Sequence, residues 1–343
     1  MTHRDRRLVA GWLFLCAALV FAIVLVGGIT RLTRSGLSIV EWQPLIGVVP
    51  PLSHADWEAL FAKYRETPEF RLVNFDMTLE GFKGIFWWEY IHRALARGIG
   101  LVFLLPYLYF LLRRKLDKPL AWKLAGIFVL GALQGAMGWI MVQSGLVDDP
   151  KVNPVRLSLH LGIALAIFAA ELWLALELLF PRRFRVGKLE AALPLVVFLM
   201  ALSGGMVAGL RAGSAYQTFP LMNGYLVPPE VLLLEPWWRN FVYNMATVQL
   251  VHRLFFWALV ILIPIAWWRS RGTLAGNAVL AAFALQAALG ISTLLMGVPV
   301  GLGAAHQGGA VLLLAAALWN AHSAKGVRTL FSISGTRALT PSA

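Results

Sequence analysis

Long apolar stretches separated by shorter polar segments run through the whole chain. Eight of them cover roughly residues 9–29, 86–112, 120–143, 158–180, 190–210, 247–268, 274–297 and 303–322. Each is close to the ~20 residues that a helix needs to cross the hydrocarbon of a bilayer. Because that hydrocarbon offers no water to unpaired main-chain groups, the stretches are predicted to be helices. The pattern therefore predicts an all-α polytopic membrane protein with eight transmembrane helices.

Composition and charge agree with this class. Of the 343 residues 59% are hydrophobic and 14% charged, too few charges to coat a soluble protein of this size. Basic segments such as residues 113–118 place both termini and the short loops in the cytoplasm. The net charge of +13 is then mainly a topology signal, so membrane lipid is an expected partner and nucleic acid is not. Cys16 is the single cysteine, which excludes an internal disulfide and a cysteine-based metal site.

Two loops on the predicted outer side are longer than the others. The first, residues 30–85, contains tryptophan, proline and an amphipathic stretch at residues 56–64. We expect it to pack as a lid over the outer face. The loop at residues 211–246 is similar in kind.

The two halves of the chain resemble each other. The matching runs are GGITRLTRSG from Gly27 with GGMVAGLRAG from Gly204, EYIHR from Glu89 with QLVHR from Gln249, LQGAMG from Leu133 with LQAALG from Leu285, and SLHLG from Ser158 with AAHQG from Ala305. Each half then holds four spans, and an even number gives both copies one orientation. We expect two pseudo-symmetric four-helix bundles, residues 1–185 and 186–343.

Four histidines open the even-numbered spans: His92, His160, His252 and His306. Those spans all run from outside to inside, so the four rings are expected toward the periplasmic face, with His92 facing His160 and His252 facing His306. One such histidine alone is typical of a hydrogen bond between helices, but four at repeat positions favour ligation of a cofactor. Zinc would gather its ligands at one point, commonly with cysteine. Two separate pairs favour two irons, each in a bis-histidine haem.

One difference separates the two pairs. Glu89 stands one turn before His92, whereas Gln249 stands one turn before His252. A carboxyl beside one haem predicts proton-coupled chemistry in the first half, where Glu89, His92 and His160 are the candidate catalytic residues. The second half would store or pass electrons. The alternative is that Glu89 only bonds to a loop at the headgroup level.

Arginines accompany two of the histidines. Arg93 and Arg253 follow directly, and Arg97 lies one turn beyond Arg93. We expect these three to bind the propionates of the haems. The alternative is that they snorkel to the membrane interface.

Long motifs in the chain resemble the haem A synthase family of bacteria and mitochondria. They are TRLTRSGLSIVEWQP at residues 30–44, IFWWEYIHR at 85–93, LQGAMGWIMVQSGL at 133–146, DDPKVNPVRLSLHL at 148–161, YQTFPLMNG at 216–224 and NMATVQLVHR at 244–253. The resemblance implies that haem o is converted to haem a for terminal oxidases. A ring methyl, at C8, becomes a formyl group through successive hydroxylations and loss of water.

The same resemblance implies the site residues. Haem o would lie between His92 and His160 with Glu89 at the methyl, and a permanent haem b between His252 and His306. It also implies haem O synthase and oxidase assembly factors as partners. The few residues before the first span favour a bacterial inner membrane. Some members carry a cysteine pair in an outer loop, which this chain lacks, so the route of the electrons is open.

Two other functions remain compatible with the sequence. A bis-histidine cytochrome that exchanges electrons with quinone would hold two b haems and form no formyl product. A transporter or haem channel would need a polar pathway at the midplane, where the spans show little polarity beyond glutamines. A prenyltransferase is excluded because no span or inner loop contains an aspartate-rich motif for a diphosphate.

Overall fold

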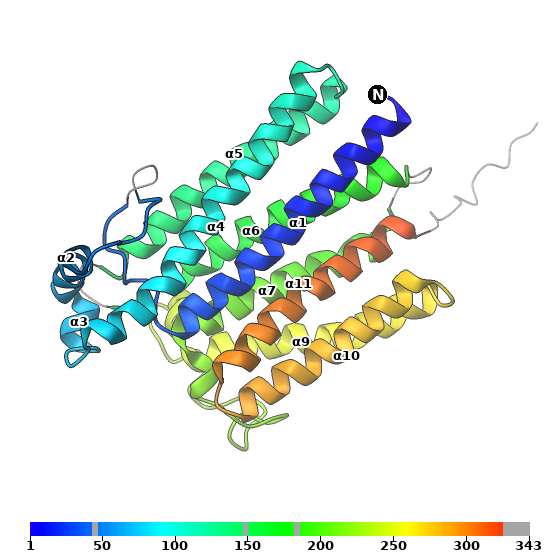
Figure 1. Cartoon of the computed structure of the whole chain (residues 1–343). Coiled ribbons are helices and arrows are strands. Elements are labelled where there is room, and N and C mark those ends of the chain that lie inside the picture. Colours follow the sequence, from blue (N-terminus) through cyan, green and yellow to red (C-terminus); the bar gives the residue numbers. More distant parts are fainter. Residues whose placement is uncertain (43–46, 147–149, 182–185, 325–343) are drawn as a thin grey trace, which may run out of the picture.

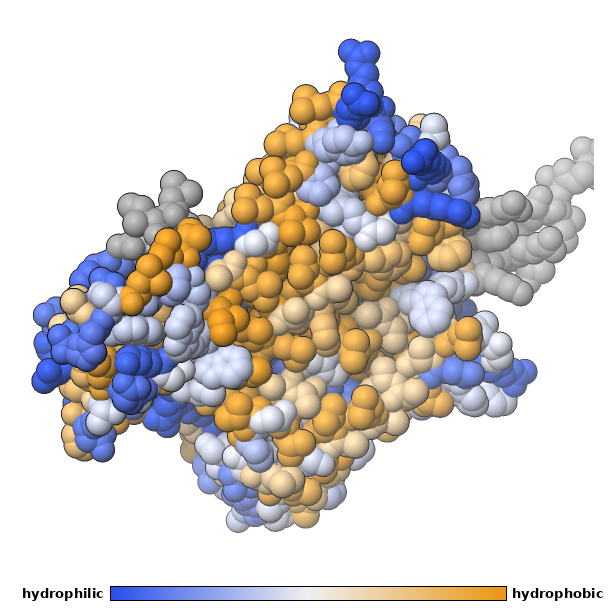
Figure 2. Space-filling model, viewed as in Figure 1, coloured by the Kyte–Doolittle hydropathy of each residue, from blue (hydrophilic) through white to orange (hydrophobic). Residues whose placement is uncertain are grey.

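The structure, a computed structural model, describes residues 1–42, 47–146, 150–181 and 186–324. Eight helices in these ranges are long and apolar enough to cross a membrane, which confirms the all-α, eight-span prediction. They are α1 (His3–Leu32), α4 (Leu79–Leu112), α5 (Lys118–Gln143), α6 (Pro154–Leu179), α7 (Lys188–Leu210), α9 (Met245–Arg269), α10 (Leu274–Leu295) and α11 (Val300–Ser323). They run side by side (Figure 1), and their apolar side chains form a band between polar ends (Figure 2).

Side chains in the connecting segments begin these helices. The hydroxyl of Thr78 accepts a hydrogen bond from an amide in the first turn of α4, and Asp117 does the same for α5. Asn153 begins α6, where the following proline needs no hydrogen-bond acceptor for its nitrogen, and Asn244 begins α9. The local sequence thus decides where α4, α6 and α9 start, and with it the depths of His92, His160 and His252.

The helices of each half form a closed ring of neighbours. In the first half α1 contacts α4, α4 contacts α5, α5 contacts α6, and α6 returns to α1. In the second half α7, α9, α10 and α11 contact one another in the same order. The helices that carry the four histidines therefore stand on opposite corners of their rings, α4 across from α6 and α9 across from α11. This arrangement supports the internal repeat; its boundary near residue 185 lies outside the described residues.

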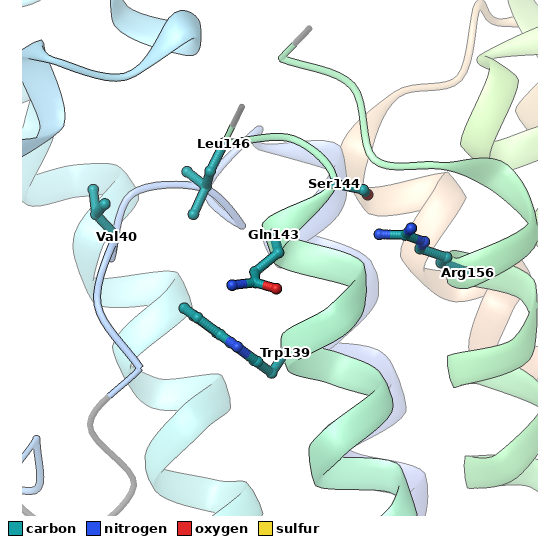
Figure 3. Close-up of a pocket in the computed structure, with 6 residues that line it drawn as sticks. All are labelled: Val40, Trp139, Gln143, Ser144, Leu146 and Arg156. Atoms are coloured by element: carbon teal, nitrogen blue, oxygen red, sulfur yellow. The ribbon is translucent and has the colours of Figure 1, made fainter. Parts of the chain in front are cut away.

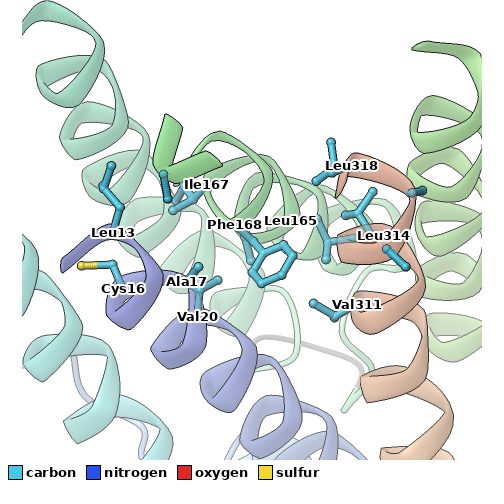
Figure 4. Packing of buried hydrophobic residues seen from close by; sticks show 14 of the residues in the cluster. Leu13, Cys16, Ala17, Val20, Leu165, Ile167, Phe168, Val311, Leu314 and Leu318 are labelled. Carbon is cyan, nitrogen blue, oxygen red and sulfur yellow. The ribbon is translucent and has the colours of Figure 1, made fainter. Parts of the chain in front are cut away.

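The two rings meet along α1, α6, α7 and α11, with α4 and α5 on one flank and α9 and α10 on the other (Figure 1). Leu13 and Val20 of α1, Leu165 and Phe168 of α6 and Leu314 of α11 are buried at this junction (Figure 4). A well-packed junction of this kind holds the two histidine pairs in a constant relation.

The start of α1 and the end of α11 lie at one end of the bundle (Figure 1). The two long loops lie at the other end, which we call the loop end. The cytoplasmic placement of the termini stays a prediction. Four residues of the family motifs lie outside the described ranges: Gln43, Pro44, Asp148 and Asp149.

The first long loop folds into α2 (His54–Arg65) and α3 (Pro68–Leu72). Ser53 and Asp56 form a capping box at the start of α2. The ring of Trp57 lies 4.9 Å from that of Phe86, edge to face, so the loop packs on the start of α4. The predicted lid is thus a helical cap on this helix. The second long loop contains only the short helices η1 (Ala212–Ser214), η2 (Trp237–Arg239) and α8 (Asn240–Tyr243).

Candidate functional site

All four predicted histidines lie near the loop end, one on each of α4, α6, α9 and α11, and all are half-buried. His92 is close enough to His160 for the charge of one ring to act on the other, and the same holds for His252 and His306. The structure therefore brings the histidines together as one pair in each half. In the described part of the chain no three or more histidine, cysteine or acidic side chains converge as a metal cluster would require.

The hydrogen bonds around His252 suit a ligand of iron. Ser203 donates its own hydroxyl hydrogen to the carbonyl of Met200, at 2.7 Å. The hydroxyl oxygen must then accept from Nδ1–H of His252, at 2.8 Å. A histidine held through Nδ1 presents the lone pair of Nε2, as metal-binding histidines commonly do.

The partners on α6 and α11 have unused polar atoms. Nδ1 of His160 and Nδ1 of His306 are buried and form no hydrogen bond of standard geometry among the described residues. Nε2 of Gln134 lies 3.4 Å from Nε2 of His160, so this glutamine connects α5 with α6 as its place in the sequence suggests. A buried ring nitrogen without a partner is costly, so these rings are incompletely held among the described residues. Each histidine pair offers the two imidazoles of a bis-histidine haem, so the residues fit a haem in each half.

Glu89 joins α4 to the first loop. Its side chain is only 3% exposed. One carboxylate oxygen accepts from the hydroxyl of Ser38 (2.7 Å) and from the amide of Ile39 (2.8 Å). The other accepts from Nη2 of Arg93 at 2.6 Å. The contact with a loop is therefore real, and it places a fixed carboxyl one turn from His92.

Arg93 holds the same loop. Its guanidinium donates to the carbonyl of Glu41 and to that of Ile39, both at 2.8 Å. Glu89 and Arg93 are four residues apart on one helical face, so they act on the loop together. Arg97 follows one turn deeper and is half-buried.

The second half repeats this arrangement with different chemistry. Gln249 donates from Nε2 to the carbonyl of Tyr216, at 3.1 Å. Arg253 donates to four main-chain carbonyls of the second loop, those of Tyr216 (3.3 Å), Thr218 (2.8 Å), Pro220 (3.1 Å) and Leu221 (3.1 Å). In both halves the arginine beside the histidine thus binds its loop, and pairing of either with haem propionates stays a prediction.

A cavity of about 660 Å³ opens at the loop end of the first half (Figure 3). It is lined by Val40, Trp139, Gln143, Ser144, Leu146 and Arg156. Arg156 lies one turn before His160 and donates to the carbonyl of Ile140, at 2.9 Å. The ring of Trp139 stacks on that of Trp42 at 5.4 Å. The cavity therefore combines a cation with aromatic surface beside the first histidine pair.

A second carboxyl lies close to Glu89. Glu69 of α3 is 4% exposed. The hydroxyl of Tyr64 donates to its carboxylate at 3.4 Å and accepts from Nδ2 of Asn74 at 2.7 Å. Burial, together with the nearby charge of Glu89, raises the pKa of Glu69 to about 7. The protonation of this loop residue thus changes near neutral pH.

Four residues of this region were not among the predicted site residues. Ser203 directly precedes Gly204 of a repeated motif, and Arg156 lies within a family motif, so the sequence held a signal for both. Ser38 also lies within a family motif, that of residues 30–44, whereas Glu69 lies on α3 of the first loop, outside every quoted motif. Nothing in the spacing of a loop indicates which of its side chains will meet a helix.

The chain is similar in sequence to known proteins over most of its length. The family model described as cytochrome oxidase assembly protein, COX15-CtaA, matches residues 10–318. The chain is 58% identical over 329 residues to heme A synthase of Nitrosospira multiformis, covering 92% of each chain. It is 51% identical over 327 residues to heme A synthase of Nitrosomonas eutropha (91% of this chain, 92% of the relative) and 44% over 329 residues to that of Parvibaculum lavamentivorans (94% and 95%). Eight spans, one histidine pair in each half and matches over this length lead to one conclusion: the chain belongs to the COX15-CtaA family.

Proposed function

We propose that this protein is a membrane oxidoreductase that converts haem o to haem a by oxidising the C8 methyl of the ring to a formyl group. The substrate haem o lies between His92 and His160, and a haem b lies between His252 and His306. The relatives named heme A synthase support the reaction. The observation that carries the division of labour is the buried carboxyl of Glu89 beside the first pair only; Gln249 replaces it in the second half.

The residues of the second half suit a permanent haem. Ser203 fixes the tautomer of His252 and leaves its Nε2 for iron, and His306 on α11 would supply the second imidazole. A bound haem b would supply a one-electron carrier close to the substrate. The clamp that Arg253 forms fastens the second loop to the helix that carries His252.

The residues of the first half suit a substrate that must react. His92 and His160 orient the ring of haem o through its iron. Glu89 then provides a carboxyl group that can accept a proton where the methyl is oxidised. Because Ser38, Ile39 and Arg93 all donate to it, both carboxylate oxygens have defined positions. The loop that they hold also closes the loop end over the reacting group.

Location and partners follow from this proposal. The apolar band of Figure 2 suits a bilayer, and we place the protein in a bacterial inner membrane with the loop end in the periplasm. A haem O synthase would supply the substrate, and assembly factors of cytochrome oxidase would receive the product.

Expression in a host that makes haem o but no haem a tests the proposal. Chromatography of extracted haems should show haem a with the wild type. Glu89→Gln should keep haem bound but form about 100-fold less haem a, a typical loss for a missing acid or base. Lys63→Met is the control, because it removes the ion pair between Lys63 and Glu41 of the same loop and leaves the three donors to Glu89 in place.

Three outcomes would contradict the proposal. Normal haem a from Glu89→Gln would falsify the role of the carboxyl. An equal loss in Lys63→Met would assign the effect to the loop instead. Two b haems with no formyl haem from the wild type would identify a dihaem electron-transfer cytochrome.

A further inference from the structure

Each of the four imidazoles lies against a glycine on a neighbouring helix of the same half. A methyl group placed on the glycine would come very close to the imidazole. The added methyl carbon would lie 3.0 Å from Nε2 of His92 if placed on Gly27, and 2.9 Å from Cε1 of His160 if placed on Gly138. In the second half it would lie 3.2 Å from Cε1 of His252 on Gly204 and 2.6 Å from Cε1 of His306 on Gly290. Any side chain at these positions would push on the ring.

These glycines occupy corresponding places in the repeat. Gly204 matches Gly27, and Gly290 matches Gly138 in the LQGAMG and LQAALG runs. Gly135 of the same run has open space around it, and alanine replaces it in the second half. Glycine is thus kept in both halves where a ring approaches and not where space is free.

The absent side chain also uncovers a hydrogen-bond acceptor. In a helix the carbonyl four residues before the glycine keeps one lone pair free, and a side chain at the glycine would shield it. At three of the four sites the carbonyl of that residue lies near the histidine ring, Gln134 by His160, Met200 by His252 and Gln286 by His306, although Nδ1 of His160 and Nδ1 of His306 form no hydrogen bond of standard geometry with it. A ring that gives Nδ1–H to such a carbonyl keeps Nε2 for iron.

We propose that the four glycines are positioning residues, each of which seats one histidine against bare helix backbone and so sets the angle at which its imidazole meets haem iron. This inference rests on the haem sites of the proposed function. It names no new ligand, but it identifies four residues that control the ligands already assigned.

The distances give the order of the effects. Alanine at Gly290 should disturb its histidine most, and alanine at Gly204 least, because Ser203 also holds that ring. The ring is the end of a side chain and can move by a few tenths of an ångström, so the fold should tolerate the change. Alanine is moreover the better helix former. The effect is therefore expected on the haem and not on folding.

Full-length Gly290→Ala and Gly135→Ala proteins, purified in detergent, provide the test. We expect Gly290→Ala to hold haem b about 10-fold more weakly, as is typical when the support of a metal ligand is lost. Its low-spin ferric haem should also show shifted g values in electron paramagnetic resonance. Gly135→Ala should match the wild type in both, and both variants should elute as folded protein.

Two results would overturn the inference. One is a Gly290→Ala protein whose haem content and resonance equal those of Gly135→Ala. The other is failure of Gly290→Ala and Gly138→Ala to fold while Gly135→Ala folds, because the glycines would then serve helix packing. If the wild type itself holds no haem at His252 and His306, the proposed function fails first, and the two failures remain distinguishable.

Discussion

The clamp on the second loop allows a quantitative test. Arg253 is 7% exposed and donates to four carbonyls of that loop. Replacing it by methionine keeps most of the apolar stem and removes every donor. A hydrogen bond to a charged group contributes about 1.5–3 kcal/mol. The four contributions do not add in full, because each terminal nitrogen is shared between two carbonyls and water can replace the donor at the exposed Thr218. We therefore expect a total loss of about 3 kcal/mol.

Hydrogen exchange of two loop amides measures this loss. The amide of Met222 donates to the carbonyl of Tyr225, and that of Asn223 to the hydroxyl of Thr218. Both bonds lie in or next to the segment of residues 216–221 that Arg253 holds, so we expect them to break when that segment separates from α9. A loss of about 3 kcal/mol should speed exchange of these amides about 100-fold, because 1.4 kcal/mol is a factor of ten. Arg253→Lys should fall between, since an ammonium cannot reproduce the planar fork of donors.

Arg239→Met is the control for this experiment. Arg239 belongs to the same loop but lies over the ring of Tyr243 at 5.8 Å and is exposed. Its replacement should leave exchange at Met222 and Asn223 unchanged. The reasoning is refuted if Arg253→Met exchanges within about 3-fold of the wild type, or if both variants speed exchange equally.

Three further predictions concern other parts of the protein. The carboxyl of Glu69 binds its proton more tightly in the folded protein, so the free energy of unfolding should fall by up to about 3 kcal/mol as pH rises from 4.5 through 7. Thermal midpoints measured over this pH range should fall in the wild type, and Glu69→Gln should lack this pH dependence. Ser203→Ala removes the acceptor of His252 and should weaken haem b retention about 10-fold in a haem titration; unchanged retention would refute its role. Leu165→Ala, at a site 1% exposed, should cost about 2–5 kcal/mol in thermal unfolding, whereas Leu159→Ala, at a site 53% exposed on the same helix, should cost much less.

Local sequence was enough to predict the helices and the end of the bundle at which the four histidines lie. A bilayer demands long apolar helices, so eight spans could be read directly, and the structure has eight. The repeat and the shared direction of the even-numbered spans placed the four histidines at one end. The Glu89 and Gln249 difference was visible because both stand one turn before a histidine.

The roles of the arginines and the glycines depended on tertiary contacts. Arg93 stands beside a histidine, which suggested haem propionates, yet its donors meet loop carbonyls more than 50 residues earlier in the chain. Gly138 belongs to a visible motif, but its closeness to His160 exists only because α5 and α6 pack together. Ser203 meets His252 in the same way, across α7 and α9.

What the sequence determined alone is the set of spans and the placement of the four histidines at one end of the bundle, because the bilayer and helix geometry act on neighbouring residues. What only the tertiary structure decided is how each histidine is held: the glycine beside its imidazole, the hydroxyl of Ser203 on the ring of His252 and the loops fastened to α4 and α9. These contacts join segments far apart in the chain, and no periodicity along it records them.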